Sequence, residues 1–218
     1  LSRIFATEAG LAQGAILSPI LISLFINSLI LDLQNTPEAG VKIGHLKITC
    51  LFFADDIVLI SDSESSLQRL LLVVQSFMNK WRLNVNLLKS GIIIAYDGRT
   101  VASDRIKTAM KTDILFNGVP IPFVEKYKYL GTMICSRSSK SLSETIFMLT
   151  KKARSRAFLL QGQMDRSNTN HRIPMRLFNA LVRPIIEYAG NVWAPRINLK
   201  LLKTIEAVQA AFLSWALN

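Results

Sequence analysis

Apolar and polar residues alternate in blocks that predict helices and short strands along this 218-residue chain. A helix is predicted with Ser18 as N-cap and Pro19 as first helical residue, because apolar residues follow it up to Leu31. This helix is apolar nearly all round, so we expect it to be deeply buried. Residues 15–31 are long enough for a membrane span, but polar residues interrupt them and favour a buried core helix.

The next blocks predict a hairpin and a second helix. Residues 40–60 are nearly alternating, which indicates a hairpin with Asp55 and Asp56 at its turn. Ser65 and Gln68 then form a capping-box pattern, and apolar residues continue at helical spacing as far as Trp81.

Strand signals follow up to about residue 135. Residues 92–96 and 127–135 are predicted as strands, and Asn117-Gly118 between apolar segments predicts a hairpin turn. The order of elements is typical of a mixed α+β layer.

From about Ser139 the pattern is wholly helical. Two apolar stripes at helical spacing carry this prediction, and they consist of Leu142, Ile146, Leu149, Ala153, Ala157 and Leu160, and of Leu199, Leu202, Ile205, Val208 and Phe212. We therefore predict two domains, residues 1–138 and residues 139–218.

Composition and charge narrow the class of protein. Half of the residues are hydrophobic, which allows a sizeable core. Cys50 and Cys135 form neither a disulfide framework nor a zinc signature, so a reducing, intracellular compartment, nuclear or cytoplasmic, is expected. Residues 139–218 hold 12 Lys and Arg against 4 Asp and Glu, which suggests a polyanion as partner rather than a membrane.

The acidic turn is the candidate chemical site. Adjacent carboxylates repel each other and are expensive to desolvate, so at the tip of an apolar hairpin Asp55 and Asp56 call for a cation. Mg²⁺ (or Mn²⁺) fits, because such ions are held by one or two carboxylates together with substrate phosphates. The alternative is a simple polar β-turn, and for an Asp-Asp pair alone this alternative is the more frequent one.

Several further motifs follow one another along the chain, and together they favour the metal site over the simple polar turn. They are Gln13-Gly14, Phe53-Ala54-Asp55-Asp56, Asn86-Leu87-Leu88-Lys89-Ser90 and Tyr127-Lys128-Tyr129-Leu130-Gly131, followed by Arg183-Pro184, Tyr188 and Trp193. The series resembles the reverse transcriptases of LINE-type (non-LTR) retrotransposons and covers nearly the whole chain.

The resemblance implies a fold and an activity. The fold would be an incomplete polymerase palm, an antiparallel sheet with packed helices, followed by an all-helical, thumb-like region. The activity would be RNA-directed DNA synthesis, in which a DNA primer 3′-hydroxyl on an RNA template attacks the α-phosphate of a deoxynucleoside triphosphate. Asp55 would ligate two metal ions, and Asp56 would be either a ligand or a support.

The resemblance also assigns roles outside the acidic turn. Gln13 and Gly14 would lie beside the nucleotide, and Lys89 would meet the leaving pyrophosphate. An ordinary turn and a solvated lysine are the alternatives.

Tyr127, Tyr129, Leu130 and Gly131 would form the primer grip, although a core role explains Tyr129 nearly as well. The residues expected to contact the nucleic-acid backbone lie off the apolar stripe of their helix and are Lys151, Lys152, Arg154 and Arg156.

One catalytic residue of the family has no counterpart in these residues. The family has a further aspartate on an upstream strand, whereas residues 1–12 contain only Glu8 as an acid. We therefore expect an internal fragment that lacks an N-terminal part of the same polypeptide and is inactive by itself. The alternative is a non-catalytic nucleic-acid-binding remnant of a retroelement.

Overall fold

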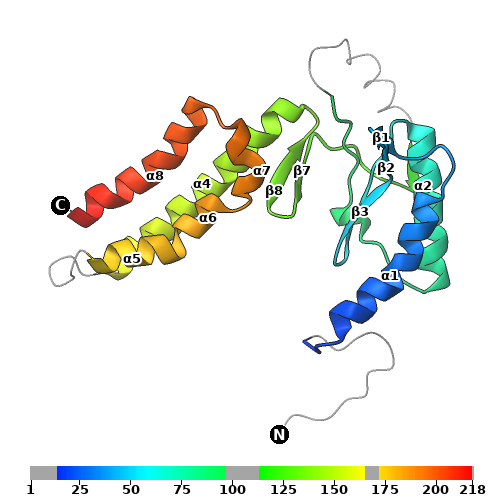
Figure 1. The fold of residues 1–218 in the computed structure, drawn as a ribbon, viewed down its shortest axis with the longest axis horizontal. Coiled ribbons are helices and arrows are strands. Elements are labelled where there is room, and N and C mark those ends of the chain that lie inside the picture. Colours follow the sequence, from blue (N-terminus) through cyan, green and yellow to red (C-terminus); the bar gives the residue numbers. More distant parts are fainter. Residues whose placement is uncertain (1–13, 97–112, 165–171, 218) are drawn as a thin grey trace, which may run out of the picture. The chain divides into compact units, whose positions relative to one another are not determined.

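The computed structural model describes residues 14–96, 113–164 and 172–217, which form two compact units (Figure 1). The first unit contains the described residues up to Ser90 together with residues 113–122, and the second contains residues 91–96 and those from Phe123 onward. Small antiparallel sheets with packed helices precede a helical region, so the predicted α+β class is confirmed. The domain boundary predicted at 138/139 stays a prediction.

The first unit is built from helices and three hairpins. Its elements are α1 (Ser18–Gln34), β1 (Val41–Ile43), β2 (Leu46–Ile48), β3 (Cys50–Phe53), β4 (Asp56–Leu59), α2 (Glu64–Lys80), η1 (Leu87–Lys89), β5 (Leu115–Phe116) and β6 (Val119–Pro120).

Helix α1 is less buried than its sequence predicts. Phe25 packs on Phe77 and Trp81 of the α2 end, with ring centroids 5.3 and 5.0 Å away, and Leu29 and Leu33 are fully buried. The first half of the helix is exposed, so the expectation of deep burial along the whole helix was wrong. An apolar surface indicates that a helix needs a partner, and α1 contacts α2 and β3. The fully buried residues of α1, however, lie only in its second half. Leu17, not Ser18, occupies the N-cap position.

None of the helices in the described part of the chain combines the length and the apolar character that crossing a membrane requires.

Residues 40–60 form two hairpins rather than the single one predicted. Strands β1 and β2 pair around Gly44, whose φ of +60° suits the turn. Strands β3 and β4 pair next, with Phe53 opposite Asp56, and carry the acidic turn.

Helix α2 begins at a different serine from the one predicted. Ser63 has an extended backbone, and its Oγ accepts a hydrogen bond from the Ser66 N–H at 3.3 Å. The capping-box prediction at Ser65 and Gln68 was therefore wrong by two residues.

Gln68 has another role. Its Nε2 donates to the Leu115 carbonyl at 2.8 Å, and its Oε1 accepts from the Leu115 N–H at 2.9 Å. Gln75, two turns further along α2, accepts from the Asn117 N–H at 3.1 Å. The β5–β6 hairpin, predicted from Asn117-Gly118, is confirmed and is fastened to α2 by side chains.

The second unit consists of one hairpin and a helical region. Its elements are β7 (Lys126–Tyr129), β8 (Thr132–Cys135), α4 (Ser138–Gln163), α5 (Arg172–Leu181), α6 (Arg183–Glu187), α7 (Gly190–Trp193), η2 (Ala194–Arg196) and α8 (Leu199–Leu217). Residues 127–135 are thus two strands with a turn, not one strand. Residues 92–96 form no strand ladder; Ile92 and Tyr96 make single bridges to Phe123 and Arg137.

The helical region has one hydrophobic core. Ala153, Ala157 and Leu160 of α4 pack with residues of α5, α6 and α8, as their stripe predicts. Phe178 and Phe212 meet at the centre with ring centroids 4.9 Å apart. In the second predicted stripe Val208 and Phe212 are buried, whereas Leu199 is exposed.

Candidate functional site

The acidic turn is the two-residue connection Ala54-Asp55 between β3 and β4. Ala54 has a φ of +53°, a conformation that residues with a Cβ rarely adopt and that tends to occur at functional sites. Asp55 and Asp56 are both exposed. The strained turn therefore presents both carboxylates to solvent.

The two faces of the β3–β4 hairpin differ. Residues opposite each other across an antiparallel pair lie on the same face, so Asp56 shares its face with Phe53, and Leu51 lies two residues further along. Phe53 and Leu51 are exposed, whereas Phe52 and Ile57 on the other face are half-buried. Asp56 thus lies at the edge of an exposed apolar strip.

The donor set of this turn suits a hard divalent cation. Carboxylate oxygens on a short hairpin are the ligands that Mg²⁺ takes together with water and substrate phosphates. Within residues 14–96, 113–164 and 172–217 no group of three or more metal-ligating side chains forms. Asp55 and Asp56 therefore fit part of a metal site.

Two of the residues predicted to border the nucleotide or its leaving pyrophosphate, Gly14 and Lys89, belong to the first unit. Gly14 is exposed and has a φ of +86°, which explains a glycine there, and a Cβ would meet no atom within 4 Å. Gln13 lies outside the described residues. Lys89 is exposed at the end of η1, where its N–H donates to the Asn86 carbonyl at 3.1 Å.

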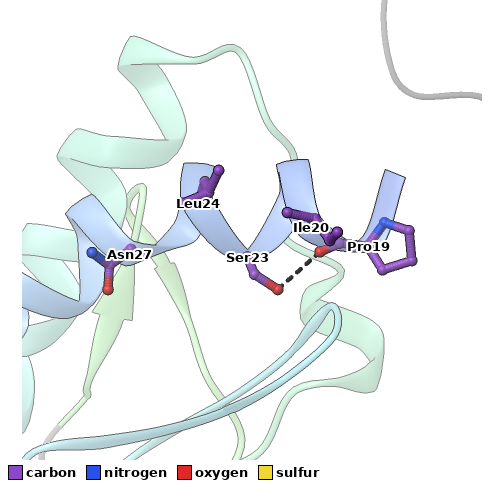
Figure 2. Close-up of a pocket in the computed structure, with 5 residues that line it drawn as sticks. All are labelled: Pro19, Ile20, Ser23, Leu24 and Asn27. Atoms are coloured by element: carbon purple, nitrogen blue, oxygen red, sulfur yellow. Dashed lines mark hydrogen bonds between the residues drawn. The ribbon is translucent and has the colours of Figure 1, made fainter. Parts of the chain in front are cut away.

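A shallow groove of about 540 Å³ runs along the exposed first half of α1 (Figure 2). Its lining is mainly apolar and comes from Pro19, Ile20, Ser23, Leu24 and Asn27. The Ser23 hydroxyl donates to the Pro19 carbonyl at 2.8 Å, as the dashed line in Figure 2 shows. The Ser23 hydroxyl thus has its donor engaged within the helix and offers the groove its acceptor lone pairs.

The predicted primer-grip residues form the β7–β8 hairpin in the second unit. Tyr127 and Tyr129 are half-buried on one face, and the turn consists of Leu130 and Gly131, which both have a positive φ. Helix α4 supports β8, because Thr145 Oγ1 and Ser141 Oγ accept from the N–H groups of Met133 and Cys135 at 2.9 Å.

A tyrosine that sequence reasoning did not assign to the site contacts this turn. The Tyr188 hydroxyl donates to the Leu130 carbonyl at 3.0 Å. The two residues are 58 positions apart, so no local pattern could reveal the contact. The sequence signal that pointed toward this contact was the presence of both the Leu130-Gly131 motif and the Tyr188 motif in one chain.

The cations predicted to contact the nucleic-acid backbone lie along α4. They are Lys151, Lys152, Arg154 and Arg156, and all four are exposed. None of the four takes part in an ion pair with another described residue, whereas Lys126 pairs with Glu144 at 3.3 Å near the start of the helix. The four charges are therefore available to a polyanion.

Comparison with known proteins identifies the family. The family model "Reverse transcriptase (RNA-dependent DNA polymerase)" matches residues 1–134, more than half of the chain, so this protein belongs to that family of nucleotidyltransferase enzymes. Enzymes of the family generally use divalent metal ions, nucleic-acid templates and primers, and deoxynucleotides.

Individual relatives agree. The chain is 32% identical over 133 residues to a Pol polyprotein of retrotransposable element R2 from Popillia japonica, covering 60% of this chain and 18% of the relative. It is 25% identical over 213 residues to the RNA-directed DNA polymerase from mobile element jockey of Drosophila funebris, covering 92% and 21%. These matches confirm the resemblance to LINE-type elements. The chain spans about a fifth of the length of these relatives.

Proposed function

We propose that this chain is part of an RNA-directed DNA polymerase that extends a DNA primer 3′-hydroxyl on an RNA template by two-metal nucleotidyl transfer. The observation that carries the proposal is the exposed Asp55-Asp56 pair on a strained hairpin tip, in a chain that belongs to the reverse transcriptase family. The setting is intracellular, in the nucleus or the cytoplasm.

The acidic turn would supply carboxylates to the reaction. Asp55 would hold the metal ions and Asp56 would be a second ligand or a support, with Mg²⁺ (or Mn²⁺) as the ion. When bound, such ions activate the attacking hydroxyl and neutralise charge that develops on the phosphate. The two strands fix the carboxylates, and the turn exposes them to the deoxynucleoside triphosphate.

Other residues would position the substrates. Gln13 and Gly14 would border the nucleotide, since the bare backbone of a glycine lets a ligand approach closely. Lys89 would face the leaving pyrophosphate as a point charge. Tyr127, Tyr129, Leu130 and Gly131 would hold the primer end.

The helical region would track the backbone of the RNA–DNA hybrid as a thumb does. Exposure of Lys151, Lys152, Arg154 and Arg156 and their lack of ion pairs with described residues support this role. Contacts of this kind contribute affinity that does not depend on sequence.

Manganese binding tests the metal site without requiring activity. We expect the 218-residue chain to bind Mn²⁺, measured by electron paramagnetic resonance, and Asp55→Asn to weaken binding at least about tenfold because a ligand is removed. Asp62→Asn is the matched control, because Asp62 is an exposed acid on the same segment. Equal binding by both variants would contradict the site.

We further propose that these 218 residues alone do not extend a primer, because two adjacent carboxylates supply only part of a two-metal site. Primer extension on an RNA template with Mg²⁺ tests this directly. Clear DNA synthesis by this chain would contradict the proposed inactivity.

A non-catalytic nucleic-acid-binding remnant is the second candidate, and the exposed cations of α4 favour it. The remnant would bind an RNA–DNA duplex yet would not bind Mn²⁺ through Asp55. The coding sequence upstream of Leu1 provides an independent check, because a strand with a catalytic Asp there favours the enzyme.

A further inference from the structure

Tyr188 contacts the tip of the β7–β8 hairpin in two ways. Its hydroxyl donates to the Leu130 carbonyl at 3.0 Å. Its ring lies against Gly131, where a Cβ would be 2.5 Å from Cε1 and 3.0 Å from Cζ. Ring and hydroxyl thus touch both residues of the turn.

The main chain of Tyr188 is itself held in place. Trp193 Nε1 donates to the Tyr188 carbonyl at 2.8 Å. Helix α6 directly precedes Tyr188 in the chain. Within this helix Arg183 Nε and Glu187 Oε1 form an ion pair of 2.6 Å, and Ile186 belongs to the hydrophobic core. The residue therefore links a packed helix to the hairpin tip.

The other supports of the hairpin lie away from its tip. Side chains of helix α4 accept hydrogen bonds from the N–H groups of Met133 and Cys135, which are both on β8. The backbones of Tyr96 and Arg137 form a single β-bridge beyond the end of that strand. Lys126 at the start of β7 pairs with Glu144 of α4 at 3.3 Å, and this support too lies at the end of the hairpin opposite its turn. A hairpin supported mainly away from its turn can tilt there, because an isolated hairpin is marginally stable in water. Tyr188 supplies a support at the tip.

We propose that Tyr188 is a positioning residue for the primer terminus: it fixes the Leu130-Gly131 turn against the helical region. The inference rests on the proposed primer-grip role of this hairpin. The group placed by the turn would be the 3′-terminal nucleotide of a primer strand, and Tyr188 itself need not touch it.

A cross-linking experiment on the full chain tests the inference. The probe is an RNA–DNA primer–template whose primer ends in a photoreactive 4-thiothymidine, and the yield of cross-link to residues 126–135 is measured beside the affinity for the duplex. Tyr188→Phe keeps the ring and removes one hydrogen bond, so the yield should fall about fivefold, with affinity and melting temperature nearly unchanged. Tyr96→Phe is the matched control and should keep the wild-type yield.

The outcomes separate the positioning role of Tyr188 from the primer-grip role of the β7–β8 hairpin. An equal yield from Tyr188→Phe and the wild type would overturn the role of Tyr188 and leave the primer grip standing. A parallel fall in yield and affinity would also overturn it, because a merely structural role lowers both. If the wild type binds the duplex but gives no cross-link at the hairpin, the primer-grip proposal fails and the inference fails with it.

Discussion

Gly131 and Tyr188 pack so closely that the ring occupies the place of a side chain at position 131. Gly131 also has a φ of +76°, which disfavours any residue with a Cβ. Two independent constraints, backbone conformation and the neighbouring ring, therefore require glycine there.

Gly131→Ala separates these constraints. We expect it to lower the free energy of unfolding by about 2–4 kcal/mol, from left-handed backbone strain and a steric clash together. In a Tyr188→Ala background only the strain of about 1–2 kcal/mol should remain. Urea denaturation of the four proteins measures the coupling, and an equal penalty in both backgrounds would show that the ring does not press on position 131.

Ser63→Ala removes the N-cap of α2. The free energy of unfolding should fall by about 1 kcal/mol, because the Ser66 N–H loses its acceptor. Ser65→Ala is the matched control two residues away and should change stability by less than about 0.5 kcal/mol. Thermal or urea unfolding measures both losses. A larger loss of stability from Ser65→Ala than from Ser63→Ala would show that Ser65 is the N-cap.

Ala54→Gly relieves strain at the acidic turn. Left-handed backbone costs alanine about 1–2 kcal/mol, while the added freedom of glycine in the unfolded chain offsets about 0.4–1 kcal/mol of the gain. We expect a net stabilisation of about 0.5 kcal/mol by urea denaturation. Loss of stability would mean that Ala54 makes contacts beyond its backbone conformation.

Charge removal on α4 should change the salt dependence of nucleic-acid binding. For Lys151→Gln with Lys152→Gln, the slope of log affinity against log salt should become shallower by up to roughly 1.8, or about 0.9 for each phosphate that is no longer neutralised. The matched control is Lys200→Gln with Lys203→Gln on α8, which removes the same charge. Fluorescence anisotropy with an RNA–DNA duplex measures the slopes, and equal changes from both pairs would indicate a diffuse field instead of contacts along α4.

Local patterns predicted the elements that pack within a short stretch of chain. The acidic turn followed from alternation that stops at Asp55, and the buried stripe of α4 followed from helical spacing, because both patterns reflect which face of an element is covered. The family resemblance then gave the acidic turn its chemical meaning.

Other features depend on interactions that no local pattern encodes. The apolar surface of α1 could not reveal which half would be covered, since that depends on where α2 lies. Ser63 and Ser65 are equally good capping residues, and the backbone conformation of Ser63 decides between them. The hydrogen bond from Tyr188 to Leu130 joins two motifs 58 residues apart.

The paired hydrogen bonds between Gln68 and Leu115 have a consequence for how this sequence can vary. A glutamine amide presents a donor and an acceptor side by side, as a neighbouring strand would. Helix α2 thus serves as a substitute edge for a hairpin that joins no larger sheet among the described residues. The hairpin is thus anchored to α2 through a side chain that lies 47 residues away in the sequence. Replacement of Gln68 should therefore be poorly tolerated during evolution, whereas the side chain at position 115 can vary, because both hydrogen bonds use the main chain of that residue.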